Sequence, residues 1–149
     1  MSPSTRKSTF LRLLFALTPL TTNGADSAPD LVVIVNPSIG VQQLSRRQTI
    51  DIFLGRYRTF PSGQNAMPID LDVGSTERAQ FYLTLAHKDQ ANMSTYWLRT
   101  SYSGRITPPF VVPDARAAVD IVANNRFAIA YVIRAAVDDR VRVALEITQ

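Results

Sequence analysis

Residues 31–35 have the sequence LVVIV, which is continuously apolar and contains four β-branched residues. Pro29 and Asp30 precede this run, and Asn36 and Pro37 follow it. A short apolar run between such turn-forming residues is typical of a strand that is buried on both faces. Strands of this kind occur in sheets that helices cover on both sides, so the run predicts an α/β protein.

The rest of the chain alternates helix and strand patterns outward from this run. A capping box at residues 45–48 starts a helix whose apolar face holds Ile50, Phe53 and Leu54, and Gly55 is expected to end it in a left-handed conformation. Further helices are expected from Ser75 or Thr76, from Asp89 and from Asp114, and further strands at residues 68–72, 110–112, 127–132 and 141–147. This order predicts a mixed, mostly parallel sheet of about five strands flanked by helices.

The composition excludes several functional classes. The 149 residues suffice for one domain, and the apolar share of 46% with 19% charged residues is typical of a globular protein. The chain has no cysteine, which excludes disulfides, thiolate metal sites and a cysteine nucleophile. Its single histidine, His87, excludes a metal site with several histidines from one chain. Because no nucleophile–base pattern is visible, we expect neither an enzyme, nor a metal, nor a cofactor.

Residues 1–27 predict a secretory signal peptide. Arg6 and Lys7 precede an apolar run at residues 10–20, and small and polar residues follow. The run is too short to span a bilayer. A buried N-terminal helix of a cytosolic protein is the alternative, but Pro19 and the polar stretch after it would end such a helix. We therefore expect export to the periplasm, a mature domain at residues 28–149 and no stable membrane insertion.

The positive charge of the chain belongs partly to this leader. The whole chain has a formal net charge of +4, from 16 basic and 12 acidic residues. Residues 1–27 hold three basic residues and one acidic residue, so 13 basic and 11 acidic residues remain and the mature part carries +2. This nearly neutral balance, together with export, argues against a nucleic-acid partner.

Several short motifs occur in an order that resembles one family. They are LVVIVNPS at residues 31–38, IFLGR at 52–56, Tyr96-Trp97, SGR at 103–105 and NRFAIAYV at 125–132. As an ordered set they resemble the phosphate-binding proteins of phosphate ABC transporters, in the type 2 periplasmic-binding-protein superfamily. The chain is too short for a two-lobed receptor, so the resemblance implies a single lobe of that fold.

The resemblance also implies a binding site for phosphate or another oxyanion where the second helix begins. A helix N-terminus offers unpaired N–H groups and a partial positive charge, and hydroxyl side chains add donors. Ser38 is expected to face the same site from the end of the first strand, and two arginines are expected to supply charge. The implied ligand-binding residues are Ser38, Gly74, Ser75, Thr76, Arg78 and Arg56.

The chain departs from the family pattern at this position. The family has Ser-Gly-Thr with an arginine upstream, whereas this chain has Gly-Ser-Thr, with Asp70 and Asp72 upstream. Two carboxylates repel a phosphate dianion unless one of them is protonated or paired. The sequence alone favours simpler roles, in which Ser75 and Thr76 are helix caps and the two aspartates are solvated carboxylates that share one face of a strand end.

Two functions therefore stay open. The first is an exported solute-binding-like module that resembles phosphate-binding proteins and holds an oxyanion at a helix N-terminus. The second is a ligand-free periplasmic domain of the same fold that binds a protein partner in the envelope. The second function would act through a basic cluster around the first helix, which consists of Arg46, Arg47, Arg56 and Arg58.

Overall fold

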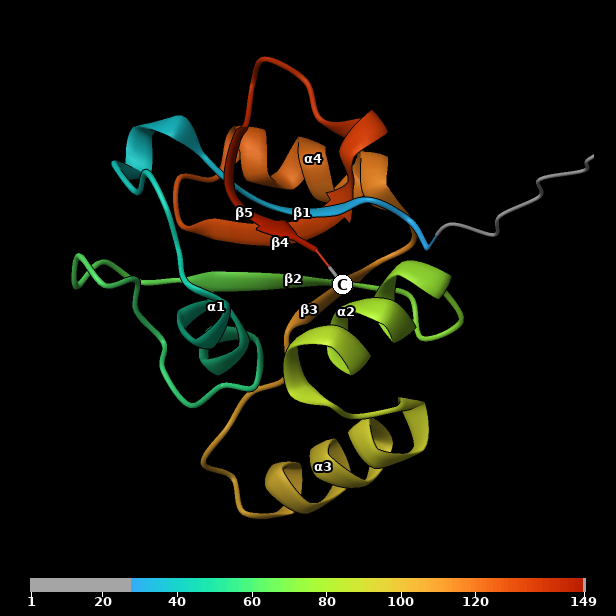
Figure 1. Ribbon diagram of the computed structural model, residues 1–149. Helices are drawn as coiled ribbons and strands as arrows, with labels where there is room; N and C mark the ends of the chain where they lie inside the picture. Colours follow the sequence, from blue (N-terminus) through green and yellow to red (C-terminus); the bar gives the residue numbers. More distant parts are fainter. Residues whose placement is uncertain (1–27, 149) are drawn as a thin grey trace, which may run out of the picture.

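The computed structural model describes residues 28–148 (Figure 1). The predicted signal peptide at residues 1–27 lies outside the described residues. The elements are β1 (Leu31–Val35), η1 (Pro37–Ile39), α1 (Arg46–Phe53), β2 (Met67–Leu71), α2 (Thr76–Ala86), α3 (Gln90–Tyr102), β3 (Phe110–Val112), α4 (Ala115–Asn124), β4 (Ala128–Ile133), η2 (Arg134–Ala136) and β5 (Arg142–Ile147). The order of strands and α-helices, and with it the α/β class, confirms the prediction from the sequence.

The five strands form one mixed sheet in the order β3-β2-β4-β1-β5. β2 runs parallel to β3 and β4, whereas β1 runs antiparallel to both of its neighbours, β4 and β5. Four strands therefore point the same way and β1 alone points against them, which confirms a mixed, mostly parallel sheet. As a consequence, β1 and β2 end at opposite ends of the sheet (Figure 1).

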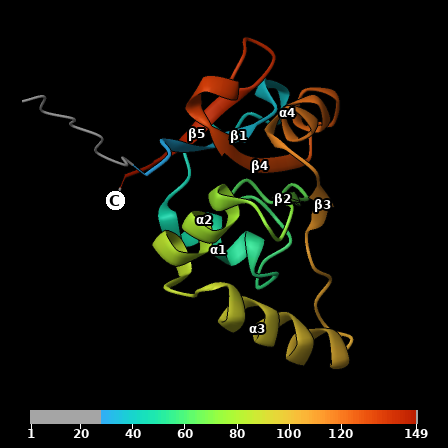
Figure 2. The same ribbon diagram turned by 90° about the vertical axis from the view of Figure 1, so that its right-hand side faces the viewer.

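Helices cover both faces of this sheet. α4 lies on one face, α1 and α2 lie on the other, and α3 packs outside α2 (Figures 1 and 2). All residues of β1 are buried, as a strand between two helical layers requires. α4 presents an apolar stripe of Ala118, Val119 and Val122 to the sheet.

A cluster of four aromatic rings joins α1 and α2 to the sheet. The Phe81 ring stacks on the Tyr131 ring of β4, with centroids 3.9 Å apart, and meets the Phe53 ring of α1 edge-on at 4.8 Å. The Tyr82 ring lies edge-on to Phe81 at 5.1 Å. All four side chains are buried, so this cluster is the centre of the core on the face of the sheet that α1 and α2 cover.

Gly55 closes α1 as the sequence predicts, with a left-handed φ of 72°. It has a second role, because a Cβ atom at this position would lie 2.3 Å from Cγ2 of Ile106. The glycine therefore lets the segment before β3 approach the end of α1 closely. In the described part of the chain, no helix has the length and apolar character that crossing a bilayer requires.

Candidate functional site

The structure brings four of the six predicted site residues together and separates the other two. Gly74, Ser75, Thr76 and Arg78 all belong to the start of α2, directly after β2. Ser38 follows β1, which runs antiparallel to the rest of the sheet, so it lies at the opposite end. The expectation that Ser38 faces the same site is therefore wrong.

Ser38 instead has a local partner. Its hydroxyl donates to Oδ1 of Asn36 at 2.6 Å, and its backbone N–H donates to the same atom at 2.9 Å. The Asn36 side chain also donates to the carbonyl oxygens of Val122 and Ala123, both at 2.9 Å. These bonds fix the turn after β1 against the end of α4, which is a structural role.

At the start of α2, the chain supplies its own anion. The Asp72 carboxylate accepts a hydrogen bond from the Gly74 N–H at 3.0 Å, and the Asp72 carbonyl accepts one from the Ser75 N–H at 2.9 Å. The Ser75 hydroxyl accepts from the Arg78 N–H at 3.2 Å, as an N-cap residue does. Asp72 thus holds two of the three amide groups that Gly74, Ser75 and Thr76 would offer to an oxyanion.

The Arg78 guanidinium points into the core and away from this helix start. Its Nε donates to Oδ2 of Asp70 at 3.0 Å, and both side chains are buried. Burial on its own lowers the pKa of Arg78, but the charge and the hydrogen bond of Asp70 outweigh burial and raise this pKa above its usual value. The positive charge of Arg78 is therefore neutralised within the fold.

Asp70 is the acceptor at the centre of a buried polar network. Besides Arg78, it accepts hydrogen bonds from the hydroxyl of Tyr82 at 2.9 Å, from the hydroxyl of Tyr131, and from the N–H of Leu71 at 3.0 Å. Only 1% of Asp70 is exposed. The expectation of a solvated carboxylate is wrong for this residue, because four donors replace its water.

The two aspartates also do not share a strand face. β2 ends at Leu71, so Asp70 is in the strand and Asp72 is in the turn that follows, where it is exposed. The sequence contained one signal of the network, which is Tyr131 within the buried run at residues 127–132. A buried tyrosine hydroxyl needs a partner, and Asp70 is flanked by two apolar residues of a strand.

We expect the network to make stability depend on alkaline pH. Burial, reinforced by the charge of Asp70, raises the pKa of both Tyr82 and Tyr131 above the ordinary value. The unfolded chain releases these protons above about pH 10 while the folded chain keeps them, so stability is full below that pH and falls above it. The two protons that the network retains contribute at most about 2.7 kcal/mol per pH unit to the slope of the free energy of unfolding. Tyr96, whose pKa burial also raises, adds to this slope from outside the network.

Urea denaturation between about pH 9 and 11 measures this slope. Tyr131→Phe removes one of the two network protons and should lower the slope by about 1.4 kcal/mol per pH unit. Tyr57→Phe changes an exposed ring outside the network and serves as the control. A free energy of unfolding that stays constant over this range would contradict the assignment.

The last predicted ligand, Arg56, follows α1 and pairs with that helix. Its Nη1 lies 2.8 Å from Oδ1 of Asp51, a buried carboxylate, and Nε of Arg47 lies 3.8 Å from Oδ2 of the same residue.

The other two arginines of the basic cluster bond to neutral oxygens. Arg58 donates from Nη2 to Oγ1 of Thr107 at 3.1 Å. Arg46 donates to the carbonyl oxygen of Thr148 at 3.0 Å. The basic cluster thus lies around α1, and Arg56 does not join Ser75.

Beside Arg58 the surface is hollowed into a groove of about 630 Å³. One wall is the segment after α1, from Gly55 to Pro68, and the other is the segment from Thr107 to Val111. Met67 begins β2 and Phe110 begins β3, so the groove lies at the end of the sheet opposite to Ser75. Among residues 28–148, no cluster of three side chains with metal-binding chemistry occurs.

The fold has clear counterparts among solved structures, although no family model and no curated protein matches the chain. An ABC-type phosphate transport receptor from Vibrio cholerae superposes with a TM-score of 0.61 at 18% identity, covering 77% of this chain and 45% of that one. A proposed phosphate ABC transporter substrate-binding protein with bound phosphate, from Clostridium perfringens, gives 0.62 at 18% identity, covering 78% and 44%.

A third structure agrees with these two. A proposed phosphate-binding protein from Planctomyces limnophilus gives a TM-score of 0.53 at 12% identity, covering 72% of this chain and 36% of that one. The chain thus spans less than half of the length of each of the three proteins. Over that part it has the fold of these phosphate ABC transporter substrate-binding proteins, as predicted from the sequence.

Proposed function

We propose that this protein is a non-catalytic protein-interaction module that has the fold of a phosphate receptor and does not use the phosphate site. It would act in the periplasm after removal of residues 1–27. The observation that carries the proposal is the position of Asp72, whose side chain and carbonyl hold the Gly74 and Ser75 N–H groups.

The charges around the start of α2 support this proposal. Asp70 and Arg78 neutralise each other in the core, which leaves Asp72 and Glu77 as the nearby charges without an ion-pair partner among residues 28–148. Both are negative. A phosphate dianion placed there would be repelled by the carboxylates of the turn before α2 and of its first turn, and one N-terminal helix dipole does not offset them.

The groove at the other end of the sheet is where we place the partner contact. Its walls carry large apolar side chains that stay exposed, with 62% of Tyr57 and 60% of Phe110 open to solvent. It lies next to the basic cluster around α1, because Arg58 belongs to both. Exposed aromatic residues beside arginine are typical of the centre of a protein–protein interface.

Oxyanion capture at the start of α2 is the second candidate function. It is supported by the fold and by the helix start itself, because the Thr76 and Glu77 N–H groups have no hydrogen-bond partner within residues 28–148. In this alternative, phosphate or another oxyanion binds weakly at Gly74, Ser75 and Thr76.

A thermal-shift titration of the protein with inorganic phosphate separates the two functions. Sulfate and a neutral salt at matched ionic strength serve as controls. A ligand at 100 times its dissociation constant adds about 2.7 kcal/mol to the free energy of unfolding, which is a readily measured shift in a domain of this size. We expect no shift beyond that of the salt control up to millimolar phosphate.

Ser75→Ala gives the matched variant for this titration. We expect it to cost about 0.5–2 kcal/mol through the lost N-cap, with the same response to phosphate as the unmodified chain. A saturable shift with phosphate that Ser75→Ala abolishes would instead establish the second function and overturn the first.

A further inference from the structure

The groove between the segment after α1 and the segment before β3 is positive as well as apolar. Arg58 is the charged residue among its lining residues. The two segments that build it, residues 55–68 and 107–111, contain Arg56 and Arg58 and no acidic residue. Within residues 28–148, Arg56 pairs with Asp51, whereas Arg58 has no carboxylate within 4.0 Å. An acidic occupant would supply the missing partner of Arg58.

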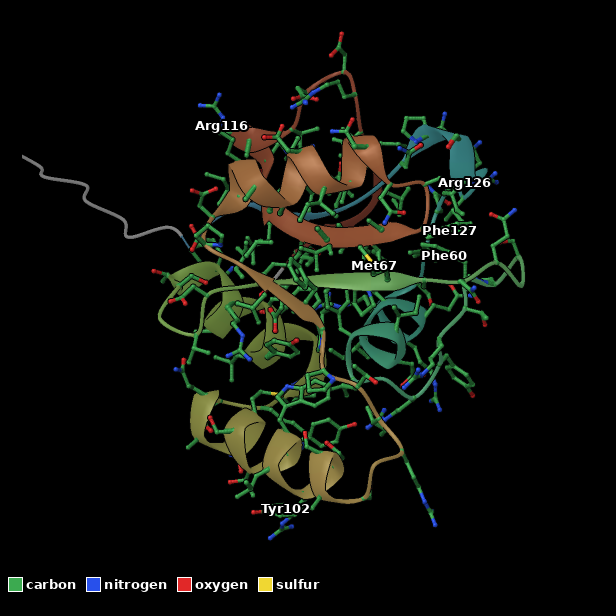
Figure 3. The ribbon with its side chains drawn as sticks, turned by 180° about the vertical axis from the view of Figure 1, so that it is seen from behind. Phe60, Met67, Tyr102, Arg116, Arg126 and Phe127 are labelled. Atoms are coloured by element: carbon green, nitrogen blue, oxygen red, sulfur yellow. The ribbon has the colours of Figure 1, made fainter. Side chains whose placement is uncertain are left out.

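A further arginine and a further aromatic ring extend this surface. The N–H of Met67, in the groove wall, donates to the carbonyl oxygen of Phe127 at 2.7 Å, so the two residues are neighbours across the sheet. The Arg126 guanidinium lies 5.4 Å from the centre of the Phe127 ring, which is 39% exposed. Figure 3 shows Met67, Phe127 and Arg126 together at this end of the sheet, and Arg116 at the other end of α4.

The edge of the sheet limits how a partner can bind here. β3 is an edge strand of three residues that pairs only with β2. Pro108 and Pro109 precede it and Pro113 follows it, so the chain on both sides lacks the N–H groups that strand addition needs. A partner is therefore recognised through side chains in the groove and not as a sixth strand.

We infer that the groove binds an extended acidic segment of a partner protein, with its apolar side chains on Phe110 and Tyr57 and a carboxylate on Arg58. This inference rests on the proposed function and names the class of partner. Arginine and aromatic residues contribute most per residue at such interfaces, and charge complementarity excludes basic segments.

Fluorescence anisotropy with three synthetic peptides tests the inference on the full chain. The probes are a peptide of alternating Asp and Phe, one of alternating Lys and Phe, and one of alternating Asp and Ser. We expect the Asp–Phe peptide to bind and the other two to bind at least about tenfold more weakly. Added salt should weaken the binding, because exposed charge pairs are screened.

Arg58→Ala and Phe110→Ser should each lower the affinity for the Asp–Phe peptide by about tenfold. Both positions are exposed, so the variants should fold, and circular dichroism verifies it. Arg116→Ala is the matched control, because it removes an exposed arginine at the other end of α4 (Figure 3). Equal affinity for the Asp–Phe and Lys–Phe peptides, or equal effects of Arg58→Ala and Arg116→Ala, would overturn the acidic partner.

The same data separate this inference from the proposed function. If both Phe-containing peptides bind and Phe110→Ser weakens the binding of both, the groove remains an interaction site and only the acidic class of partner is rejected. If Phe110→Ser changes the affinity for none of the three peptides, and phosphate binds saturably, both the proposed function and this inference are rejected.

Discussion

Asp70→Asn is expected to lower the free energy of unfolding by about 3–5 kcal/mol. The substitution leaves the buried Arg78 guanidinium without its counter-charge at the 3.0 Å contact. It also puts an amide donor into a site where Tyr82, Tyr131 and the Leu71 N–H all donate toward the same carboxylate. An uncompensated buried charge and opposed donors are among the most costly changes in a core. Urea denaturation at neutral pH measures the loss.

Asp72→Asn is the matched control for this prediction. It makes the same chemical change two residues along the chain, at an exposed carboxylate whose hydrogen bond to the Gly74 N–H an asparagine oxygen can replace. We expect a change of no more than about 0.5 kcal/mol. Equal losses for the two variants would show that the Asp70 network does not stabilise the fold more than a surface turn does.

Phe81→Ala is expected to cost about 3–5 kcal/mol. The ring is fully buried and lies between the sheet and α1, stacked on Tyr131 at 3.9 Å and edge-on to Phe53 at 4.8 Å. Its removal opens a cavity next to Tyr131, which holds its hydroxyl against Asp70. The lost burial of the ring and the cost of the cavity therefore both lower the free energy of unfolding. The free energy of unfolding in urea is the readout, with the slope of the transition as a check on two-state behaviour.

Leu83→Ala provides the comparison on the same helix. Leu83 is 57% exposed, two residues after Phe81, and truncating it should change stability by no more than about 0.5 kcal/mol. A loss for Phe81→Ala no greater than that for Leu83→Ala would mean that the aromatic cluster is not the centre of the core.

The fold could be predicted well from local patterns. The run at residues 31–35 became β1 with every residue buried, and Ser45 and Gly55 bound the first helix with the expected capping box and left-handed conformation. These features could be predicted because each depends on neighbouring residues alone, through hydrogen bonds to the nearest amides and through the burial of apolar side chains.

The candidate site could be predicted only in part, because it depends on tertiary geometry. The sequence located the start of α2 and its Ser75 cap correctly. It could not give the direction of β1 relative to β2. Because the two strands run in opposite directions, Ser38 lies at the end of the sheet opposite to Ser75. Nor could it show that Asp70, the partner of Arg78, is buried, because part of the network around Asp70 is Tyr131, which is 61 residues away in the chain and meets Asp70 only in the folded sheet.

We propose that Asp72 takes the place of an oxyanion at the start of α2. The most direct test follows the backbone amide resonances of Gly74, Ser75 and Thr76 by NMR during a titration with inorganic phosphate, and repeats it with sodium chloride at matched ionic strength. We expect the resonances of the Gly74 and Ser75 amides, which already donate to Asp72, to move no further with phosphate than with sodium chloride. Saturable movement of both amides with phosphate alone would contradict it.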